Sequence, residues 1–380
     1  MKHWFSLIIL SLVLFSCLDE QSGRKGSDAK AKQKKIFDES KHEGGREIIK
    51  AGSISQYTGK PGRLIVVANN TEYTDEIAEV FDSVFAAPIR PYYPPTPHFE
   101  VFNRSPEDFV RLSTGLRNVI ELIIDEKVEK GNPKMHIYEN YYAKTQLYTK
   151  LRAHDINDLY DLILQEIEYL FKVYDRQEWK REFYRHPAKG NMDVRKKLQS
   201  KFGIDLRLPT GYRYESVNDE YAILLFPDRT RQMDLQTNDS YSSSKVNFIQ
   251  SGVMIWQYPY TDEQQMEPDN LLKMRDTILK YYALHELKGV YMGTQYHPAA
   301  MPVFEKLKIG DVTGYQARGL FKFTGASEPS GGRFWSFHFK HPHRNTIVAL
   351  SGYIDGPPTM SPSFDINRIR AVLYSLKVVD

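Results

Sequence analysis

Cysteine occurs once in the chain, at Cys17. One thiol cannot form an intrachain disulfide, so any domain after it must be held together by its hydrophobic core alone. Cysteine-based metal sites and cysteine nucleophiles beyond residue 17 are excluded for the same reason. The chain can supply the core, because 41% of its 380 residues are hydrophobic and 13% are aromatic. Its length leaves room for two domains of modest size.

The residues in front of Cys17 have the pattern of a secretory signal peptide. Lys2 and His3 precede an apolar run at 5–15, which is too short to cross a bilayer as a helix. The tetrapeptide at 14–17, Leu-Phe-Ser-Cys, resembles a bacterial lipobox, in which the cysteine thiol is acylated and the chain is cut before it. An ordinary signal peptide with a chance cysteine is the alternative.

We therefore expect residues 1–16 to be removed and Cys17 to be the lipid-attachment residue. Several acyl chains, such as palmitate, on one residue suffice for stable anchoring, because each buried methylene contributes about 0.8 kcal/mol. The expected location is the cell envelope, at the outer membrane, with the periplasmic and the surface face both left open. The membrane is then a partner through the lipid anchor.

Residues 17–61 predict a disordered tether behind the lipidated cysteine. They are mostly Lys, Glu, Asp, Gly and Ser and have no sustained apolar period. Over the whole chain 51 basic side chains stand against 48 acidic ones, a formal charge of +3. So small an excess argues against nucleic acid as a partner.

Residues 62–190 predict an N-terminal α+β domain that ends in a long helix. Thr74 or Asp75 can cap a first helix, Ser105 starts a short one, and apolar residues at three- and four-residue steps predict a helix from Asp155 to about Tyr184. Apolar or alternating runs predict strands at 62–68, 98–102, 117–125, 134–141 and 144–152.

Residues 191–380 predict a second α+β domain that is richer in strand. Helices are expected at 192–202, from 267 onward and at 364–376, and strands at 212–216, 221–226, 253–258, 315–323, 333–339 and 346–354. The polar segment from Arg229 to Lys245 is expected to be an exposed loop. The fold class is thus α+β, with two α/β sandwich domains of mainly antiparallel sheets and packed helices.

Five segments stand in a fixed order behind the lipobox: Ile255–Asp262, Met274–Asp276, Gly289–Thr294, Gly314–Leu320 and Arg370–Lys377. In combination they resemble an uncharacterised lipoprotein family of the Bacteroidota, catalogued as domain of unknown function 4837 (DUF4837). Gly62–Val67 and the strand at Arg117-Asn118 share the resemblance. The chain departs from the family pattern at Arg333, where the family has proline, and in its histidine-rich turn near His341. The resemblance implies an envelope lipoprotein and supplies no activity.

Aromatic residues are the most unusual feature of the second half. On strands such residues most often fill the core, and we favour that interpretation. If they face solvent instead, they form a stacking platform for sugar rings, a peptide or a partner lipoprotein, near which arginines can orient an anionic group. The candidate ligand or partner surface comprises Trp256, Tyr258, Tyr260, Arg275, Tyr291, Arg318 and Trp335.

Candidates for metal binding and catalysis have simpler explanations. His338, His341 and His343 are close in sequence, but the segment between two strands predicts a hairpin turn, where Lys340 and Arg344 repel a cation. The adjacent acids at 125 and 126 lie on a strand and point to opposite faces, so they do not flank one bond. We therefore expect no metal, no cofactor and no catalytic residue.

Two classes of function remain open. The first, which we prefer, is a non-catalytic envelope module that is tethered by Cys17 and binds a partner protein or a glycan. The second is an envelope hydrolase with a carboxylate- or histidine-based site, whose acid and base come from distant residues such as Asp262, Asp276 or Glu305.

Overall fold

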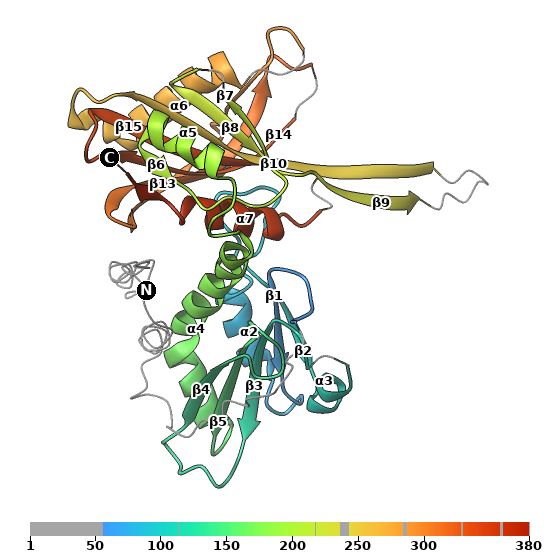
Figure 1. The fold of residues 1–380 in the computed structure, drawn as a ribbon. Helices are drawn as coiled ribbons and strands as arrows, with labels where there is room; N and C mark the ends of the chain where they lie inside the picture. The colour runs from blue at the N-terminus through green and yellow to red at the C-terminus, as the bar shows by residue number, and fades with distance from the viewer. Residues whose placement is uncertain are drawn as a thin grey trace, which may run out of the picture. The chain divides into compact units, whose positions relative to one another are not determined.

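A computed structural model describes residues 56–112, 114–216, 218–235, 243–283, 287–327, 330–357 and 360–379. These residues form two compact units (Figure 1). The N-terminal unit comprises 56–89 and 95–181, and the C-terminal unit comprises 90–94 and 182–379. Both contain helices and sheets, which confirms the predicted α+β class. Cys17 and the expected tether up to residue 55 lie outside the described residues.

The N-terminal unit contains a five-stranded sheet in the order β2-β1-β3-β5-β4. Its strands are β1 (Arg63–Val67), β2 (Glu100–Arg104), β3 (Asn118–Ile124), β4 (Lys134–Glu139) and β5 (Leu147–Ala153). β2, β1, β3 and β5 run parallel, and only β4 is antiparallel to its neighbour. This sheet therefore departs from the mainly antiparallel expectation, because a helix returns the chain between β1 and β2 and between β2 and β3, and β4 returns it between β3 and β5.

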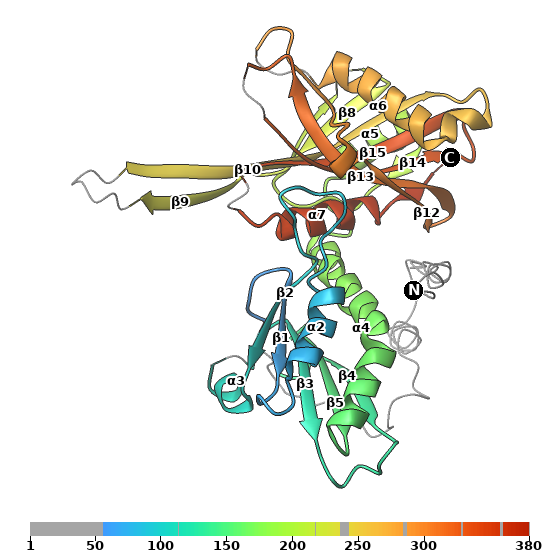
Figure 2. The ribbon, with the colours of Figure 1, turned by 180° about the vertical axis from the view of Figure 1, so that it is seen from behind.

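The helices of this unit are α2 (Asp75–Val84), α3 (Pro106–Leu112) and α4 (Ile156–Arg185, whose last turn belongs to the C-terminal unit). Thr74 caps α2 as expected, since its hydroxyl accepts from the Ile77 N–H at 3.4 Å. α2 and α4 cover one face of the sheet and bury the main core there (Figure 2). The other face, which we call the second face, has a smaller core: Ile65, Val67, Phe109, Val119 and Tyr148.

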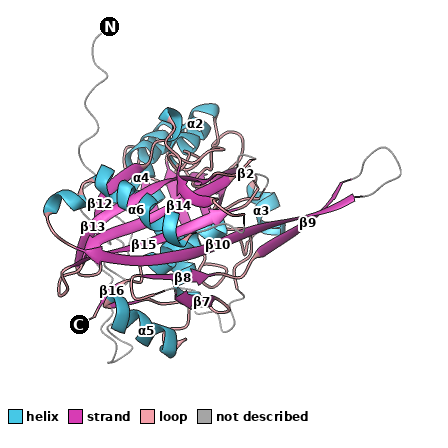
Figure 3. Cartoon of the chain, turned by 90° about the horizontal axis from the view of Figure 1, so that it is seen from above, coloured by secondary structure: helices cyan, strands magenta, loops and turns pink. Residues whose placement is uncertain are grey.

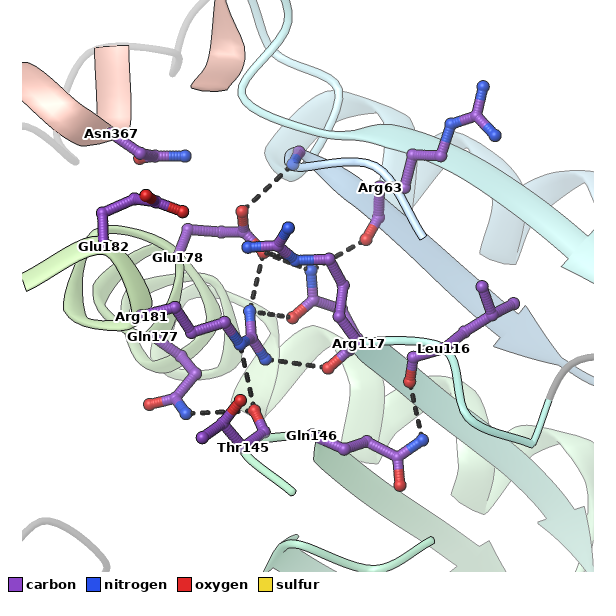
Figure 4. Close-up of polar contacts among 12 residues, drawn as sticks. Arg63, Leu116, Arg117, Thr145, Gln146, Gln177, Glu178, Arg181, Glu182 and Asn367 are labelled. Atoms are coloured by element: carbon purple, nitrogen blue, oxygen red, sulfur yellow. Dashed lines mark hydrogen bonds and ion pairs between the residues drawn. The ribbon is translucent and has the colours of Figure 1, made fainter. Parts of the chain in front are cut away.

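One buried carboxylate, Glu178 of α4, joins this helix to the sheet (Figure 4). Its Oε2 accepts from the Gly62 N–H at 3.1 Å, and its Oε1 accepts from Asn118 Nδ2 at 2.6 Å. The same Oε1 lies 3.0 Å from Arg117 Nε and 2.7 Å from Arg181 Nη1. Three distant segments of the chain therefore meet at one side chain.

This cluster buries two positive charges against one negative charge. The side chains of Arg117, Glu178 and Arg181 are 3%, 2% and 1% exposed. Burial lowers the pKa of Arg181 to about 10, against the opposing effect of Glu178, so the guanidinium stays protonated at neutral pH. The ring of Tyr57 stabilises both cations by cation–π contacts. Its centroid lies 4.8 Å from the guanidinium carbon of Arg117 and 5.3 Å from that of Arg181.

The C-terminal unit contains a nine-stranded antiparallel sheet, whose main path is β11-β13-β14-β15-β10-β8-β7, and a separate pair, β6 and β16. β12 pairs with β13, and β9 pairs with β10. The strands are β6 (Ile204–Asp205), β7 (Arg213–Ser216), β8 (Tyr221–Leu225), β9 (Arg229–Leu235), β10 (Ser243–Pro259), β11 (Tyr291–Thr294), β12 (Val303–Ile309), β13 (Val312–Thr324), β14 (Gly331–Lys340), β15 (Thr346–Asp355) and β16 (Lys377–Val378). Here the antiparallel expectation is confirmed, although β11 and β12 were not among the predicted strands.

Helices pack on both faces of this larger sheet. They are α5 (Met192–Phe202), α6 (Pro268–Tyr282) and α7 (Ser363–Leu373), with short 3-10 turns η3 (Glu263–Met266) and η4 (Pro298–Ala300). Leu272 and Leu279 of α6 share one core with Trp256 and Phe334. α7 packs on the opposite face, where a Cβ on Gly352 would lie 2.2 Å from Ile369 Cγ2. Glycine is therefore required at 352 for this close approach.

The prediction of an exposed loop from Arg229 to Lys245 is wrong. β9 and the first part of β10 form a two-stranded ribbon over Arg229–Leu235 and Ser243–Ile249, which extends away from the sheet (Figures 1 and 3). Residues 236–242 are not described. A ribbon beyond the sheet has no core to cover, so it needs no apolar alternation, and the hydropathy pattern therefore did not reveal it.

Replacing Glu178 with alanine tests the role of the buried carboxylate. Glu178→Ala leaves two arginines buried without their counter-charge, and breaking such a pair costs about 3–5 kcal/mol. We expect the free energy of unfolding of the N-terminal unit, measured by chemical denaturation of the full chain, to fall by this amount. Glu168→Ala, at an exposed position of the same helix, serves as the control and should change it by less than about 0.5 kcal/mol. Equal stability of the two variants would refute the assigned role.

Candidate functional site

The second face of the N-terminal sheet carries a cluster of tyrosines. Tyr138 lies on β4, Tyr148 lies on β5, and Tyr141 and Tyr142 lie in the loop between them. The ring of Tyr141 is 4.9 Å from that of Tyr138, 4.6 Å from that of Tyr142 and 4.5 Å from that of Tyr148, measured between centroids. Tyr148 is buried, Tyr142 is 42% exposed, and the other two are half-buried. We call these four residues the tyrosine face.

The loop that carries two of these tyrosines has a strained backbone, which buried hydrogen bonds hold in place. Asn140 and Thr145 have φ angles of 61° and 64°, a region that a β-branched residue rarely adopts. The fully buried Gln146 accepts from the Tyr142 N–H at 2.8 Å and donates to two backbone carbonyls of the loop before β3, at 2.7 and 2.6 Å. Strain of this kind persists only where the surroundings enforce it, so the loop holds its tyrosines in a fixed position.

Three ion pairs join neighbouring strands on the same face. Strand alternation places their residues on the side of Tyr148, because parallel partners in register share a face. The pairs are Arg63 with Glu100 (3.1 Å), Lys150 with Glu121 (3.5 Å) and Arg152 with Asp125 (2.5 Å).

Two of the polar groups beside the tyrosines have shifted pKa values. Burial, with the charge of Glu121, raises the pKa of Tyr148 far above its usual range, so its hydroxyl stays neutral and donates to Glu121 Oε2 at 2.8 Å. Burial lowers the pKa of Lys150, but its hydrogen bond to Tyr141 and the charge of Glu121 outweigh this and raise it. Lys150 is therefore charged at neutral pH, with Nζ 5.0 Å from the Tyr141 centroid. Aromatic rings of this kind can stack on a ligand, and the hydroxyl and charged groups beside them can form hydrogen bonds to it.

The structure places the aromatic residues predicted on β10 mostly in the core. Trp256 is 0% and Tyr258 is 8% exposed, and both pack between the sheet and α6. Tyr260 follows β10, is half-buried, and lies under Lys340, whose Nζ is 3.8 Å from the ring centroid. Tyr291 on β11 is also half-buried.

Trp335 and Arg318 lie on the opposite face of this sheet. Trp335 is 4% exposed, and its Nε1 donates to Gln316 Oε1 at 2.8 Å. The guanidinium carbons of Arg318 and of Arg370 on α7 are each 5.1 Å from its ring centroid. The candidate residues of the C-terminal unit are thus divided between two faces of the sheet.

Arg275 of α6 is fully buried. Its Nη1 donates to Thr294 Oγ1 at 2.7 Å, and its guanidinium carbon lies 3.9 Å from the centroid of the Phe334 ring. Burial lowers the pKa of Arg275 to about 10, so it remains charged at neutral pH. A side chain buried in this way cannot orient an anionic ligand at the surface.

The histidines have structural partners. His338 is 2% exposed, with Nε2 3.0 Å from Ser336 Oγ. His341 lies 3.0 Å from the Gly203 carbonyl through Nε2, and its Nδ1 accepts from the N–H groups of His343 (3.2 Å) and Arg344 (3.1 Å). These bonds close the expected turn between β14 and β15. Within the described residues, no three histidine, cysteine, aspartate or glutamate side chains are grouped as a metal site requires.

The acids proposed for a hydrolase also have structural partners. Asp262 caps η3 by accepting from the Gln264 N–H at 2.9 Å, and Glu305 Oε2 accepts from Gln316 Nε2 at 3.3 Å. Asp276 accepts from the Thr294 N–H and from the Tyr296 hydroxyl, both at 2.8 Å. Asp276 also lines an open cavity of about 460 Å³ on α6, together with Asp269, Leu272, Lys273, Thr277 and Tyr296.

The C-terminal unit is related to a known protein family. Residues 191–373 match the model of the domain of unknown function DUF4837. The C-terminal unit belongs to the DUF4837 family. The predicted resemblance is thereby confirmed for this part of the chain. Residues 57–185, which include Gly62–Val67 and Arg117-Asn118, match a different model, the domain of unknown function DUF8532.

Solved structures with some similarity to the chain are distant. A mutant of protein Mog1 is 9% identical, with a TM-score of 0.28 over 47% of this chain and 92% of that one. The Ran-binding protein Mog1p of Saccharomyces cerevisiae is 10% identical, with a TM-score of 0.27 over 47% and 91%. A Bacteroides thetaiotaomicron protein is 8% identical, with a TM-score of 0.23 over 47% and 46%. These values are too low to support an argument about function. No curated protein matches the chain.

The tyrosine face was not among the sites predicted from the sequence, because the predicted aromatic surface lies entirely in the DUF4837 part. A signal was present: Tyr138 lies on an expected strand, a Tyr-Tyr pair follows it, and Tyr148 lies on the next strand. Pairing these strands antiparallel places Tyr138 opposite Tyr148, as the structure shows.

Buried histidines predict acid sensitivity of the DUF4837 unit. Burial lowers the pKa of His338 to about 3 and that of His186 to about 4, whereas an unfolded histidine titrates near 6.5. Between these values the unfolded chain binds more protons, so stability falls as the pH falls below about 6.5, by up to about 1.4 kcal/mol per pH unit for each histidine. We expect His338→Gln to reduce this slope in denaturation curves between about pH 6.5 and pH 4. The exposed His297→Gln is the control, and an equal slope in both variants would contradict the prediction.

Proposed function

We propose that this protein is a lipid-anchored cell-envelope protein that binds a partner protein or a glycan through the tyrosine face and catalyses no reaction. The observation that carries the proposal is the geometry of this face: clustered rings, one of them 42% exposed, on a loop held by buried hydrogen bonds. Rigid aromatic side chains give large contact areas at a small entropic cost, which suits a binding surface.

The anchor in this proposal is Cys17, at the end of the lipobox-like sequence. Acyl chains on this residue would hold the protein at the membrane, and the tether would give the folded units reach from its surface, but only up to residue 55, since residues 56–61 belong to the N-terminal unit and Tyr57 packs on Arg117. Among the described residues, no helix is both long enough and apolar enough to cross a bilayer.

A binding role fits the site better than hydrolysis does. The tyrosine face offers stacking surface and paired charges, while the acids of the α6 cavity include Asp276, whose oxygens already accept from Thr294 and Tyr296. A general acid or base needs a proton that it can exchange with a substrate, and this bonding pattern gives no support to such a role.

Lipid attachment is tested by Cys17→Ser. Without the thiol no diacylglycerol can be attached, so we expect the variant to lose the mass of its acyl chains and to leave the detergent phase in phase partitioning of cell extracts. Intact-mass spectrometry and partitioning of the wild-type protein provide the reference. A variant that remains in the detergent phase would show that Cys17 is not the anchor.

The binding face is tested by crosslinking in cells. We expect the lipidated wild-type protein to capture an envelope component reproducibly, and the double variant Tyr138→Ala/Tyr142→Ala to lose at least about four-fifths of it, since two stacking contacts together contribute about 1–3 kcal/mol. Tyr281→Ala removes a ring that is 69% exposed on α6 and is the matched control. Far-UV circular dichroism confirms the fold of each variant. Undiminished capture by the double variant would rule out the tyrosine face as the binding surface.

A further inference from the structure

We infer that the ligand of the tyrosine face is an uncharged glycan. This inference rests on the proposed binding function and narrows it to one class of ligand. Three observations support it: the paired charges of the second face, the hydrogen-bonding groups that these pairs leave accessible, and the angle between two of the rings.

The charges on the second face are neutralised in pairs, and one of them, Lys150, lies beside the rings. Arg63, Lys150 and Arg152 each lie within 3.5 Å of a carboxylate oxygen on the neighbouring strand or directly after it. A phosphate-bearing or acidic polymer gains most from cations that it can neutralise, and here it would have to displace a carboxylate first. Paired charges therefore disfavour a charged ligand at this face.

The same ion pairs suit a ligand that is rich in hydroxyl groups. The side chains of Arg152 and Glu100 are 41% and 43% exposed, and that of Lys150 is 24% exposed, so solvent still reaches them. An ammonium or guanidinium group offers several donors and a carboxylate several acceptors, of which one ion pair uses only a part. A sugar hydroxyl both donates and accepts, so it can bind at either member of a pair.

The rings provide the apolar part of the site. Tyr141 and Tyr142 meet at 85°, with centroids 4.6 Å apart, so that one ring stands as a wall beside the other. A pyranose has an apolar face of C–H groups that stacks on one ring while its edge contacts the second. His136, whose ring lies nearly parallel to that of Tyr138 at 6.2 Å, continues the row of rings along β4. The row is suited to several sugar units in line.

A nucleic acid or an acidic peptide would also stack on tyrosines, but each needs unpaired cations for its backbone or side chains. The arginines and the lysine named above are paired with carboxylates, so the structure favours the uncharged glycan. The difference is measurable, because binding to a neutral ligand does not depend on salt.

The test uses the full lipidated chain in a detergent without sugar headgroups, since a maltoside or glucoside would itself compete for the face. The probes are neutral hexasaccharides of β-1,4-glucose, α-1,4-glucose, β-1,4-mannose and β-1,4-N-acetylglucosamine. A hexamer of galacturonic acid and a hexamer of thymidylate are the anionic comparators. Isothermal calorimetry measures each affinity at about 50 mM and about 500 mM NaCl.

We expect at least one neutral hexasaccharide to bind with a Kd below about 1 mM, changed less than about twofold by salt. Tyr142→Ala should weaken this binding about fivefold, as expected for the loss of one stacking ring, and the control Tyr281→Ala should not change it. Binding of the anionic hexamers alone, with steep salt dependence, would overturn the inference, and so would the absence of neutral binding below about 1 mM.

The outcomes separate this inference from the proposed function. If no neutral hexasaccharide binds but Tyr138→Ala/Tyr142→Ala still loses its crosslinked envelope component, the glycan is refuted and the binding face stands. If the tyrosine variants change neither readout, both are refuted.

Discussion

The N-terminal unit depends on one buried carboxylate. Glu178 compensates two arginines, accepts from the N–H in front of β1 and from Asn118 on β3, and so fixes α4 against one face of the sheet. Because α4 and α2 together cover that face, the second face is left with only a small core and half-exposed side chains. The exposure of the tyrosine face is thus a consequence of where the buried charge holds the long helix.

The two units use aromatic residues for different purposes. In the DUF4837 unit the large rings of Trp256 and Phe334 fill the space between a broad sheet and α6. In the N-terminal unit the rings of Tyr141 and Tyr142 are held in a loop whose backbone is forced into the left-handed region at both ends. Stability explains the first arrangement. The second costs conformational energy at Thr145, a β-branched residue held at a φ of 64°.

Local chemistry made many elements predictable from the sequence. The Thr74 hydroxyl caps α2, and α5 ends where predicted because Gly203 follows it with a left-handed φ angle of 63°. Tertiary choices were not predictable in this way. Whether Trp256 is buried depends on which face α6 covers, and the tyrosine face exists only once Tyr138 pairs opposite Tyr148. The ribbon of β9 and β10 was missed because pairing beyond a sheet leaves no trace in hydropathy.

The order of strands in the DUF4837 unit has a consequence for how the chain reaches its folded state. β15, the last long strand, lies between β14 and β10, so it joins a group formed by β7, β8 and β10 to a group formed by β11 to β14. Until residues 346–355 have been synthesised, each group keeps an open edge, and the pairing that closes the sheet spans about a hundred residues of sequence. The two groups of strands can therefore join only after β15 has been synthesised. A nascent chain that stalls before Thr346 exposes two unpaired strand edges at once, those of β10 and β14.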